Sequence, residues 1–148
     1  MVREIQTQDR SASNVVAQVR ALQEIRTSAD IVLVRHLVRE WSGQIGFGLV
    51  DQTKVITAAS ELGRNTLVHG GGGSMQVETV VNGTRSGIRL TFEDAGRGIA
   101  DVDQALRDGF STQGGLGLGL GGSKRLVNDF QIHSRPGQGT RVVVTRWR

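Results

Sequence analysis

Residues 93–122 read EDAGRGIADVDQALRDGFSTQGGLGLGLGG, with an acidic start and a glycine-rich end. Asp94 is followed by two alternate glycines, Gly96 and Gly98, and glycines alternate with leucines near the end of the stretch. Residues 123–130 then show a pattern typical of a helix. Glycines let a backbone approach an anion closely, and the amides at the start of a helix offer positive potential. The stretch therefore predicts a site for a polyphosphate ligand.

A second motif lies upstream, on a predicted helix. Glu61 and Asn65 are four residues apart, so both project from one face of that helix. The glycines alone would fit a flexible loop about equally well, since they match neither the dinucleotide fingerprint nor the Walker loop. Together with the Glu/Asn pair and a late Gly139-Thr140 pair, they favour a nucleotide site over a flexible loop.

In these motifs the chain resembles the superfamily of gyrase, Hsp90, histidine-kinase and MutL ATPases, also called GHKL proteins. The matching elements keep the family's order: Glu61 with Asn65, Asp94-x-Gly96-x-Gly98, Gly115-x-Gly117-x-Gly119 and Gly139-Thr140. Within this superfamily the chain resembles the RsbT-type serine/threonine kinases, which are switch proteins of bacterial stressosomes. That resemblance runs from about residue 22 to the C-terminus and includes ELGRN at 61–65, DGFST at 108–112, GGLGLGL at 114–120 and KRL at 124–126.

The resemblance implies a role for each motif residue. Asp94 is expected to accept a hydrogen bond from the adenine amine, helped by the Thr140 hydroxyl. Asn65 is expected to ligate Mg²⁺ and Glu61 to act as the general base toward a substrate hydroxyl. Further contacts with ATP are expected from two glycine-rich segments, through Gly96, Gly98, Gly115, Leu116, Gly117, Leu118, Gly119 and Leu120.

The resemblance also implies an activity and partners. We expect an ATP-dependent protein serine/threonine kinase that phosphorylates STAS-domain proteins and, once released, binds and activates a PP2C-type phosphatase. The alternative is an anti-sigma factor of the related kinase family, which holds a sigma subunit. A detached histidine-kinase ATP domain is less favoured, because the chain has no dimerising helix pair with a phosphoacceptor histidine.

Composition narrows the function classes. The 148 residues are enough for one core, and a net charge of +4 with four Phe and two Trp is unlike a nucleic-acid-binding surface. The chain has no apolar run of about 18 residues and no basic-apolar leader, so we expect a cytoplasmic protein without a membrane span. Because cysteine is absent, disulfides and thiolate metal sites are excluded.

Hydrophobic periodicity predicts the elements. Residues 1–21 are expected to be an N-terminal extension that includes a strand at 2–7, and residues 22–148 the kinase domain. Residues 13–25 suggest a short helix and residues 21–26 an edge strand. Ser28 and Asp51 are the expected N-caps of two long helices, the second ending at His69, which is expected to cap it. The remaining elements are a hairpin at 75–92, helices at 99–110 and 116–129, and strands at 130–134 and 140–147.

This order of elements predicts an α+β fold. Antiparallel strands with helices gathered on one face form a two-layer sandwich. We therefore expect a mixed, mainly antiparallel sheet with helices on one side, as in the Bergerat ATP-binding fold that the resemblance implies.

Overall fold

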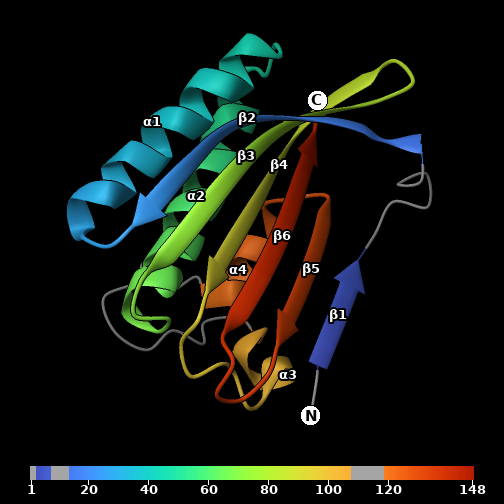
Figure 1. The fold of residues 1–148 in the computed structure, drawn as a ribbon. Coiled ribbons are helices and arrows are strands. Elements are labelled where there is room, and N and C mark those ends of the chain that lie inside the picture. Colours follow the sequence, from blue (N-terminus) through green and yellow to red (C-terminus); the bar gives the residue numbers. More distant parts are fainter. Residues whose placement is uncertain (1–2, 8–13, 108–118) are drawn as a thin grey trace.

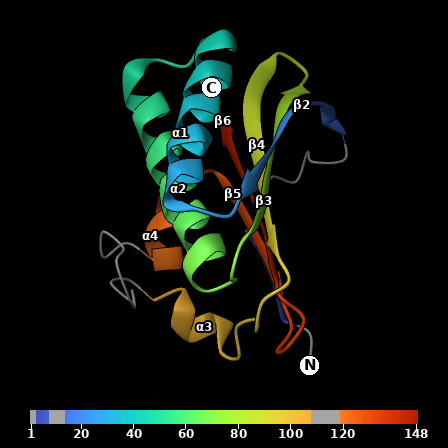
Figure 2. The ribbon, with the colours of Figure 1, turned by 60° about the vertical axis from the view of Figure 1, so that its left-hand side comes forward.

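The computed structural model describes residues 3–7, 14–107 and 119–148. A sheet forms one layer, and the helices α1, α2 and α4 cover one of its faces (Figures 1 and 2). The elements in chain order are β1 (Arg3–Thr7), β2 (Val16–Ile25), α1 (Ser28–Gln44), α2 (Leu49–Val68), β3 (Gly73–Asn82), β4 (Arg85–Asp94), α3 (Val102–Ala105), α4 (Gly119–Arg125), β5 (Asp129–Ser134) and β6 (Thr140–Trp147). The predicted two-layer α+β fold is confirmed.

The sheet has six strands in the order β1-β5-β6-β4-β3-β2. All five neighbouring pairs in the described part of the chain are antiparallel, so the sheet there lacks the parallel pair that a mixed sheet would need. The β3–β4 hairpin turns at Gly83, whose φ of 63° lies in the left-handed region that glycine tolerates. In the ladders, Asp94 is opposite both Gly73 and Thr140. The C-terminal end of β4 and the N-terminal end of β6 therefore lie side by side.

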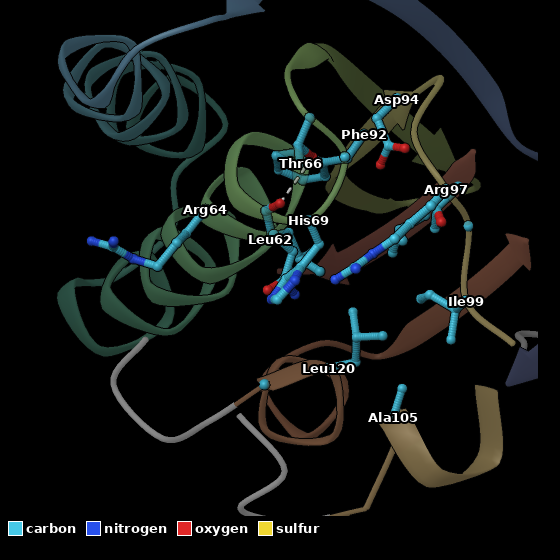
Figure 3. Close-up of a pocket in the computed structure, with 16 residues that line it drawn as sticks. Leu62, Arg64, Thr66, His69, Phe92, Asp94, Arg97, Ile99, Ala105 and Leu120 are labelled. Atoms are coloured by element: carbon cyan, nitrogen blue, oxygen red, sulfur yellow. Dashed lines mark hydrogen bonds between the residues drawn. The ribbon is translucent and has the colours of Figure 1, made fainter. Parts of the chain in front are cut away.

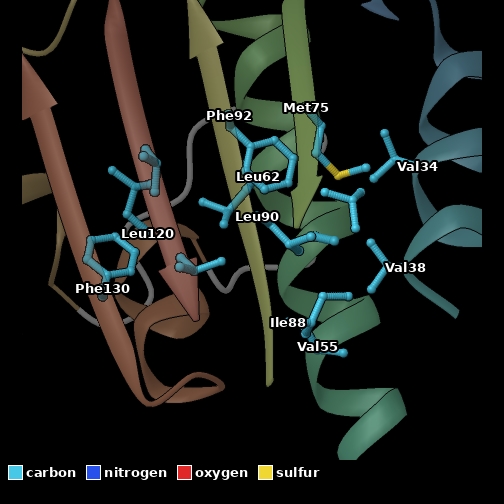
Figure 4. Close-up of a cluster of buried hydrophobic side chains, with 14 of the residues drawn as sticks. Val34, Val38, Val55, Leu62, Met75, Ile88, Leu90, Phe92, Leu120 and Phe130 are labelled. Atoms are coloured by element: carbon cyan, nitrogen blue, oxygen red, sulfur yellow. The ribbon is translucent and has the colours of Figure 1, made fainter. Parts of the chain in front are cut away.

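One buried cluster joins the two layers (Figure 4). Alternate residues of β3, β4, β5 and β6 point toward the helices, as period-2 patterning requires. The helices contribute apolar residues at helical spacing. The largest fully buried side chains include Phe92 and Phe130 from strands, with Val34, Val38, Val55 and Leu62 from helices. This core fixes α2 against β4, which is the contact that positions the site.

The starts of the two long helices differ from the prediction. The N-cap of α1 is Thr27 and not Ser28, and the Asp30 carboxylate accepts hydrogen bonds from the amides of Arg26 and Thr27 at 2.8 and 3.0 Å. These bonds lower the pKa of Asp30. The N-cap of α2 is Gly48 and not Asp51. The start of α1 therefore uses a capping box of Thr27 and Asp30, a side-chain pattern present in the sequence, whereas the start of α2 at Gly48 depends on backbone geometry.

The helix expected at 99–110 is limited, within the described residues up to 107, to Val102–Ala105. Two further element predictions are wrong. The helix suggested at residues 13–25 is absent, because Val16–Ile25 forms β2 and pairs along the full length of β3 with a register shift between Val19 and Ala21. The expected boundary between residues 21 and 22 thus falls inside this strand. The helix expected at 116–129 ends at Arg125, and Asp129 already begins β5. In both places, long-range strand pairing overrides the local pattern.

No helix in the described ranges is long and apolar enough to cross a membrane.

Arg146 connects β6 to the helical layer, and we predict that it stabilises the fold. Its guanidinium donates to the Leu126 carbonyl at 2.9 Å and to the Asp51 carboxylate, with only 14% of the side chain exposed. We expect Arg146→Met to lower the free energy of unfolding by about 1–3 kcal/mol, because the bonds of a largely buried charge are lost. Urea denaturation measures this change.

Arg141→Met is the matched control. Arg141 lies on the same strand, but its ion pair with Glu93 is solvent-exposed on both sides. We expect a change of less than about 0.5 kcal/mol for this variant. Equal effects of the two substitutions would contradict a special role for Arg146.

Candidate nucleotide site

A cavity of about 230 Å³ lies where β4 ends and β6 begins (Figure 3). Its walls come from the C-terminal part of α2, the end of β4, the loop that follows β4, and residues of α3, α4 and β6. Segments that are far apart in the sequence therefore line one cavity. The residues on its wall that sequence analysis had selected are Asn65, Asp94, Gly98, Gly119, Leu120 and Thr140.

The other selected residues are placed differently. Glu61 is only 3% exposed and is not part of the cavity wall, although it lies one helical turn before Asn65. Gly96 supports the wall from behind, since an added Cβ would stand 2.7 Å from the Cα of Gly70. Gly115, Leu116, Gly117 and Leu118 lie outside the described residues.

Asp94 is the last residue of β4, and its carboxylate faces the cavity. One carboxylate oxygen accepts a hydrogen bond from the Gly96 amide at 2.9 Å. Burial raises the pKa of Asp94, while hydrogen bonds from the backbone of Gly96 and Thr140 and the nearby His69 act in the opposite direction. A carboxylate that is short of water at a strand end is well suited to accept a hydrogen bond from a ligand.

Glycines create the space that Asp94 occupies. A Cβ at Gly70 would stand 2.3 Å from the Asp94 Cγ, and a Cβ at Gly139 would stand 2.1 Å from the Asp94 carbonyl oxygen. Gly139 also has a φ of 89°, which a larger residue rarely adopts. Side chains at these positions would push the carboxylate or the strand end away, so the glycines are needed for the shape of the site.

Ser134 holds Thr140 and the loop after β4 in place. Its buried hydroxyl donates to the Gly139 carbonyl at 3.2 Å and accepts from the Ile99 amide at 2.8 Å. The Thr140 hydroxyl lies 2.9 Å from it. Either hydroxyl can be the donor in that contact, and in both cases the Thr140 hydroxyl can form a further hydrogen bond with a ligand. Sequence analysis missed this role of Ser134, although it is a polar residue in the inward-facing series of Phe130 and Ile132.

His69 and Arg97 are two further wall residues that the motifs did not predict. His69 is the C-cap residue of α2, as expected, but it also lines the cavity. Burial is the main cause that lowers the pKa of His69, the charge of Arg97 acts in the same direction, and Asp94 opposes them. The signal for Arg97 was its place between Gly96 and Gly98, two glycines that were expected to contact ATP.

The described side chains near Asn65 offer few ligand atoms for a metal ion. An ion there would take most of its ligand atoms from a bound small molecule and from water. Within the described ranges, no group of three or more His, Cys, Asp or Glu side chains could hold a metal. Mg²⁺ keeps several waters and commonly binds one or two protein oxygens together with phosphate oxygens. The Asn65 amide oxygen on the cavity wall meets that need.

Comparison with known proteins agrees with this site. The family model described as "Histidine kinase-, DNA gyrase B-, and HSP90-like ATPase" matches residues 50–147. The chain is 43% identical over 123 residues to the serine/threonine-protein kinase RsbT of Bacillus subtilis (strain 168), covering 83% of this chain and 92% of that protein. It is 27% identical over 118 residues to an anti-sigma F factor of Thermoanaerobacter sp. (strain X514), covering 76% and 82% respectively.

A solved structure shares the fold. The crystal structure of the RsbU and RsbW domains of Rv1364c from Mycobacterium tuberculosis aligns with a TM-score of 0.57 at 20% identity, covering 90% of this chain and 32% of that one. At this identity the likeness supports the fold alone.

We predict that Gly70→Ala weakens nucleotide binding without unfolding the protein. The new methyl group would stand 2.3 Å from the Asp94 Cγ and 2.5 Å from its Cβ, so the carboxylate must rotate and the end of β4 must shift, and both changes move the carboxylate from its position facing the cavity. If that costs one charge-assisted hydrogen bond, affinity falls roughly tenfold or more. Calorimetric titration with ATP measures the change. Gly48→Ala is the control, because nothing lies within 4 Å of its added Cβ; the same loss in both variants would contradict the steric argument.

Proposed function

Because the chain belongs to the histidine kinase-, DNA gyrase B- and HSP90-like ATPase family, and within it to the RsbT-type serine/threonine kinases, we propose that it transfers a phosphoryl group from ATP to a protein serine or threonine. The observation that carries this proposal is the cavity that gathers Asn65, Asp94 and Thr140 from three separate elements. The carboxylate of Asp94, the hydroxyl of Thr140 and the side-chain amide of Asn65 are groups that can bind a nucleotide together with Mg²⁺.

Recognition of adenine is assigned to Asp94 and Thr140. The adenine amine donates a hydrogen bond, and the half-buried Asp94 carboxylate is a matching acceptor. The Thr140 hydroxyl lies across the strand pair from Asp94 and is held by Ser134. Gly98 on the cavity wall, with Gly96 behind it, keeps side chains out of the space for the base and ribose.

Phosphate binding is assigned to Asn65 and the glycine-rich segment. When bound, Mg²⁺ neutralises charge on the phosphates, and the Asn65 amide oxygen would be its protein ligand. The backbone of Gly115, Leu116, Gly117, Leu118, Gly119 and Leu120 would hold the phosphates. Of these, Gly119 and Leu120 line the cavity at the start of α4.

Glu61 is assigned the role of general base. It would take the proton of the substrate hydroxyl while that oxygen bonds to the γ-phosphorus, and ADP leaves with the electrons of the broken phosphoanhydride bond. Its position one turn from Asn65 on α2 supports this assignment. Glu61 is almost fully buried and does not line the cavity, so this role requires that docking of the substrate protein rearranges the wall near Asn65 and brings the hydroxyl within reach of Glu61.

The proposed substrates are STAS-domain proteins, and the proposed second partner is a PP2C-type phosphatase that the released kinase binds and activates. Identity of 43% with a protein named RsbT supports this partner-switching role in the cytoplasm. Phosphorylation adds about −1.5 to −2 charges to the substrate, which would weaken its contact with a site built around nucleotide phosphates. The second candidate, an anti-sigma factor, is supported by the 27% identity with anti-sigma F factors.

We predict that Asp94→Asn lowers ATP affinity about ten- to a hundredfold, because a charge-assisted hydrogen bond to adenine is lost. The raised pKa of Asp94 adds a pH signature. ATP affinity of the wild-type protein should fall as the pH drops through that raised pKa and the carboxylate gains a proton, whereas the Asn variant should lack this component. Calorimetry over a pH series from 8 down to about 4, near the usual pKa of an aspartate, tests both points, with the exposed neighbour Glu93→Gln as control. Unchanged affinity in Asp94→Asn would remove Asp94 from the adenine site.

We predict that Glu61→Gln slows phosphotransfer by roughly 10²–10⁴ while ATP binding persists, because the nearly isosteric amide cannot accept the proton. The assay incubates the chain with Mg-ATP and a cognate STAS protein, and mass spectrometry quantifies phosphoserine and phosphothreonine. Glu40→Gln, an exposed glutamate on α1, should retain full activity. If no STAS protein gains phosphate and the chain instead captures a sigma subunit in an ATP-dependent manner, the anti-sigma function replaces the kinase function.

A further inference from the structure

Arg97 lies in the loop that follows β4 and lines the cavity, and its backbone is held firmly. The Arg97 carbonyl accepts a hydrogen bond from the Gly137 amide at 2.7 Å. The next residue, Gly98, has a φ of 74°, and a Cβ there would stand 2.2 Å from the Arg135 carbonyl oxygen. The loop is therefore packed against the turn between β5 and β6, and the origin of the Arg97 side chain is fixed at the cavity mouth.

The Arg97 side chain extends into the cavity. In Figure 3 it runs from the loop toward His69, at the end of α2, and away from the Asp94 carboxylate. His69 follows Asn65 by one helical turn. The guanidinium is thus directed away from the end of the cavity assigned to the base, at Asp94, and toward the end of α2 that carries His69 and, one turn earlier, Asn65.

This guanidinium is a cation without an acidic partner in the described part of the chain. The ion pairs described there belong to other arginines: Arg26, Arg89, Arg141 and Arg146. Asp94, the acid on the same wall, already accepts from the Gly96 amide. The charge of Arg97 also lowers the pKa of His69 and so favours the neutral imidazole, which places the positive potential of the guanidinium on this side of the cavity. An anion bound there would find a pre-positioned donor and meet little local negative charge.

We propose that Arg97 binds the phosphate chain of the nucleotide, an inference that rests on ATP as the proposed ligand. A guanidinium presents a planar set of N–H donors that matches phosphate oxygens and stays charged at every physiological pH. The base is already provided with Asp94 and Thr140, whereas the α- and β-phosphates must cross the cavity toward Asn65. Arg97 makes the cavity selective for nucleotides that carry several phosphates over the nucleoside.

The experiment compares ATP, ADP, AMP and adenosine by calorimetry with the wild-type chain and with Arg97→Gln. We expect Arg97→Gln to weaken ATP and ADP about ten- to a hundredfold and to leave adenosine within about twofold. Arg97→Lys should recover part of the loss, because it keeps the charge but not the fork of donors. Thermal unfolding of each variant confirms that it is folded.

Arg135→Gln is the matched control. It removes the same charge from the neighbouring turn, where the Arg135 side chain contacts Gln138 and does not line the cavity. It should leave all four affinities within about twofold. An equal loss for adenosine and ATP in Arg97→Gln would instead mean stacking on the base and would overturn the phosphate assignment, as would unchanged ATP affinity.

These outcomes are separable from failure of the proposed function. A wild-type chain that binds ATP and phosphorylates a STAS protein, combined with an unaffected Arg97→Gln variant, overturns only the role of Arg97. A wild-type chain that binds none of the four compounds overturns the nucleotide site, and the role of Arg97 with it.

Discussion

The pairing of β4 with β6 is the constraint on which the rest of the structure depends. The ladder runs from Gly87 opposite Trp147 to Asp94 opposite Thr140 without a break. A slip by one residue would move Phe92 and its inward-facing neighbours out of the core, so burial of apolar side chains fixes the register. The same register brings the candidate adenine acceptor and its hydroxyl partner together at the strand ends. Stability of the core and geometry of the site therefore have one origin.

Close approach of backbones shapes the cavity. Gly70, at the end of α2, and Gly139, before β6, both lie where a Cβ would collide with Asp94. Helix, strand and turn can then converge on one carboxylate without a bulky side chain between them. Burial acts on both charge types there, since it raises the pKa of Asp94 and lowers that of His69. Burial thus disfavours the charged form of each residue. A hydrogen-bond donor at one end of a ligand would stabilise the Asp94 carboxylate, and negative charge along the ligand would stabilise a protonated His69.

A small polar network connects the loop after β4 to the turn between β5 and β6, beside the cavity. Ser134 ties Ile99 to Gly139 and Thr140, and the Gly137 amide holds the Arg97 carbonyl. The loop after β4 is thus fixed to the β5–β6 turn by the Ser134 hydroxyl and by one backbone hydrogen bond, from Gly137 to Arg97. Because the hydrogen bond that holds Arg97 in this loop is made by its backbone carbonyl, its side chain can extend into the cavity.

Sequence alone determined the elements whose signals are local. The two long helices, the β3–β4 hairpin and the last two strands follow from periodicity, and Asn65, Asp94 and Thr140 follow from motif spacing. Tertiary structure decided what depends on distant partners. Residues 16–25 become a strand because β3 offers them a ladder, and Glu61 is buried off the cavity wall by packing around α2. Gly70, Arg97 and Ser134 acquire their roles only when the end of α2, the end of β4 and the start of β6 come together. Contacts between residues so far apart in the sequence leave no periodic pattern in either segment.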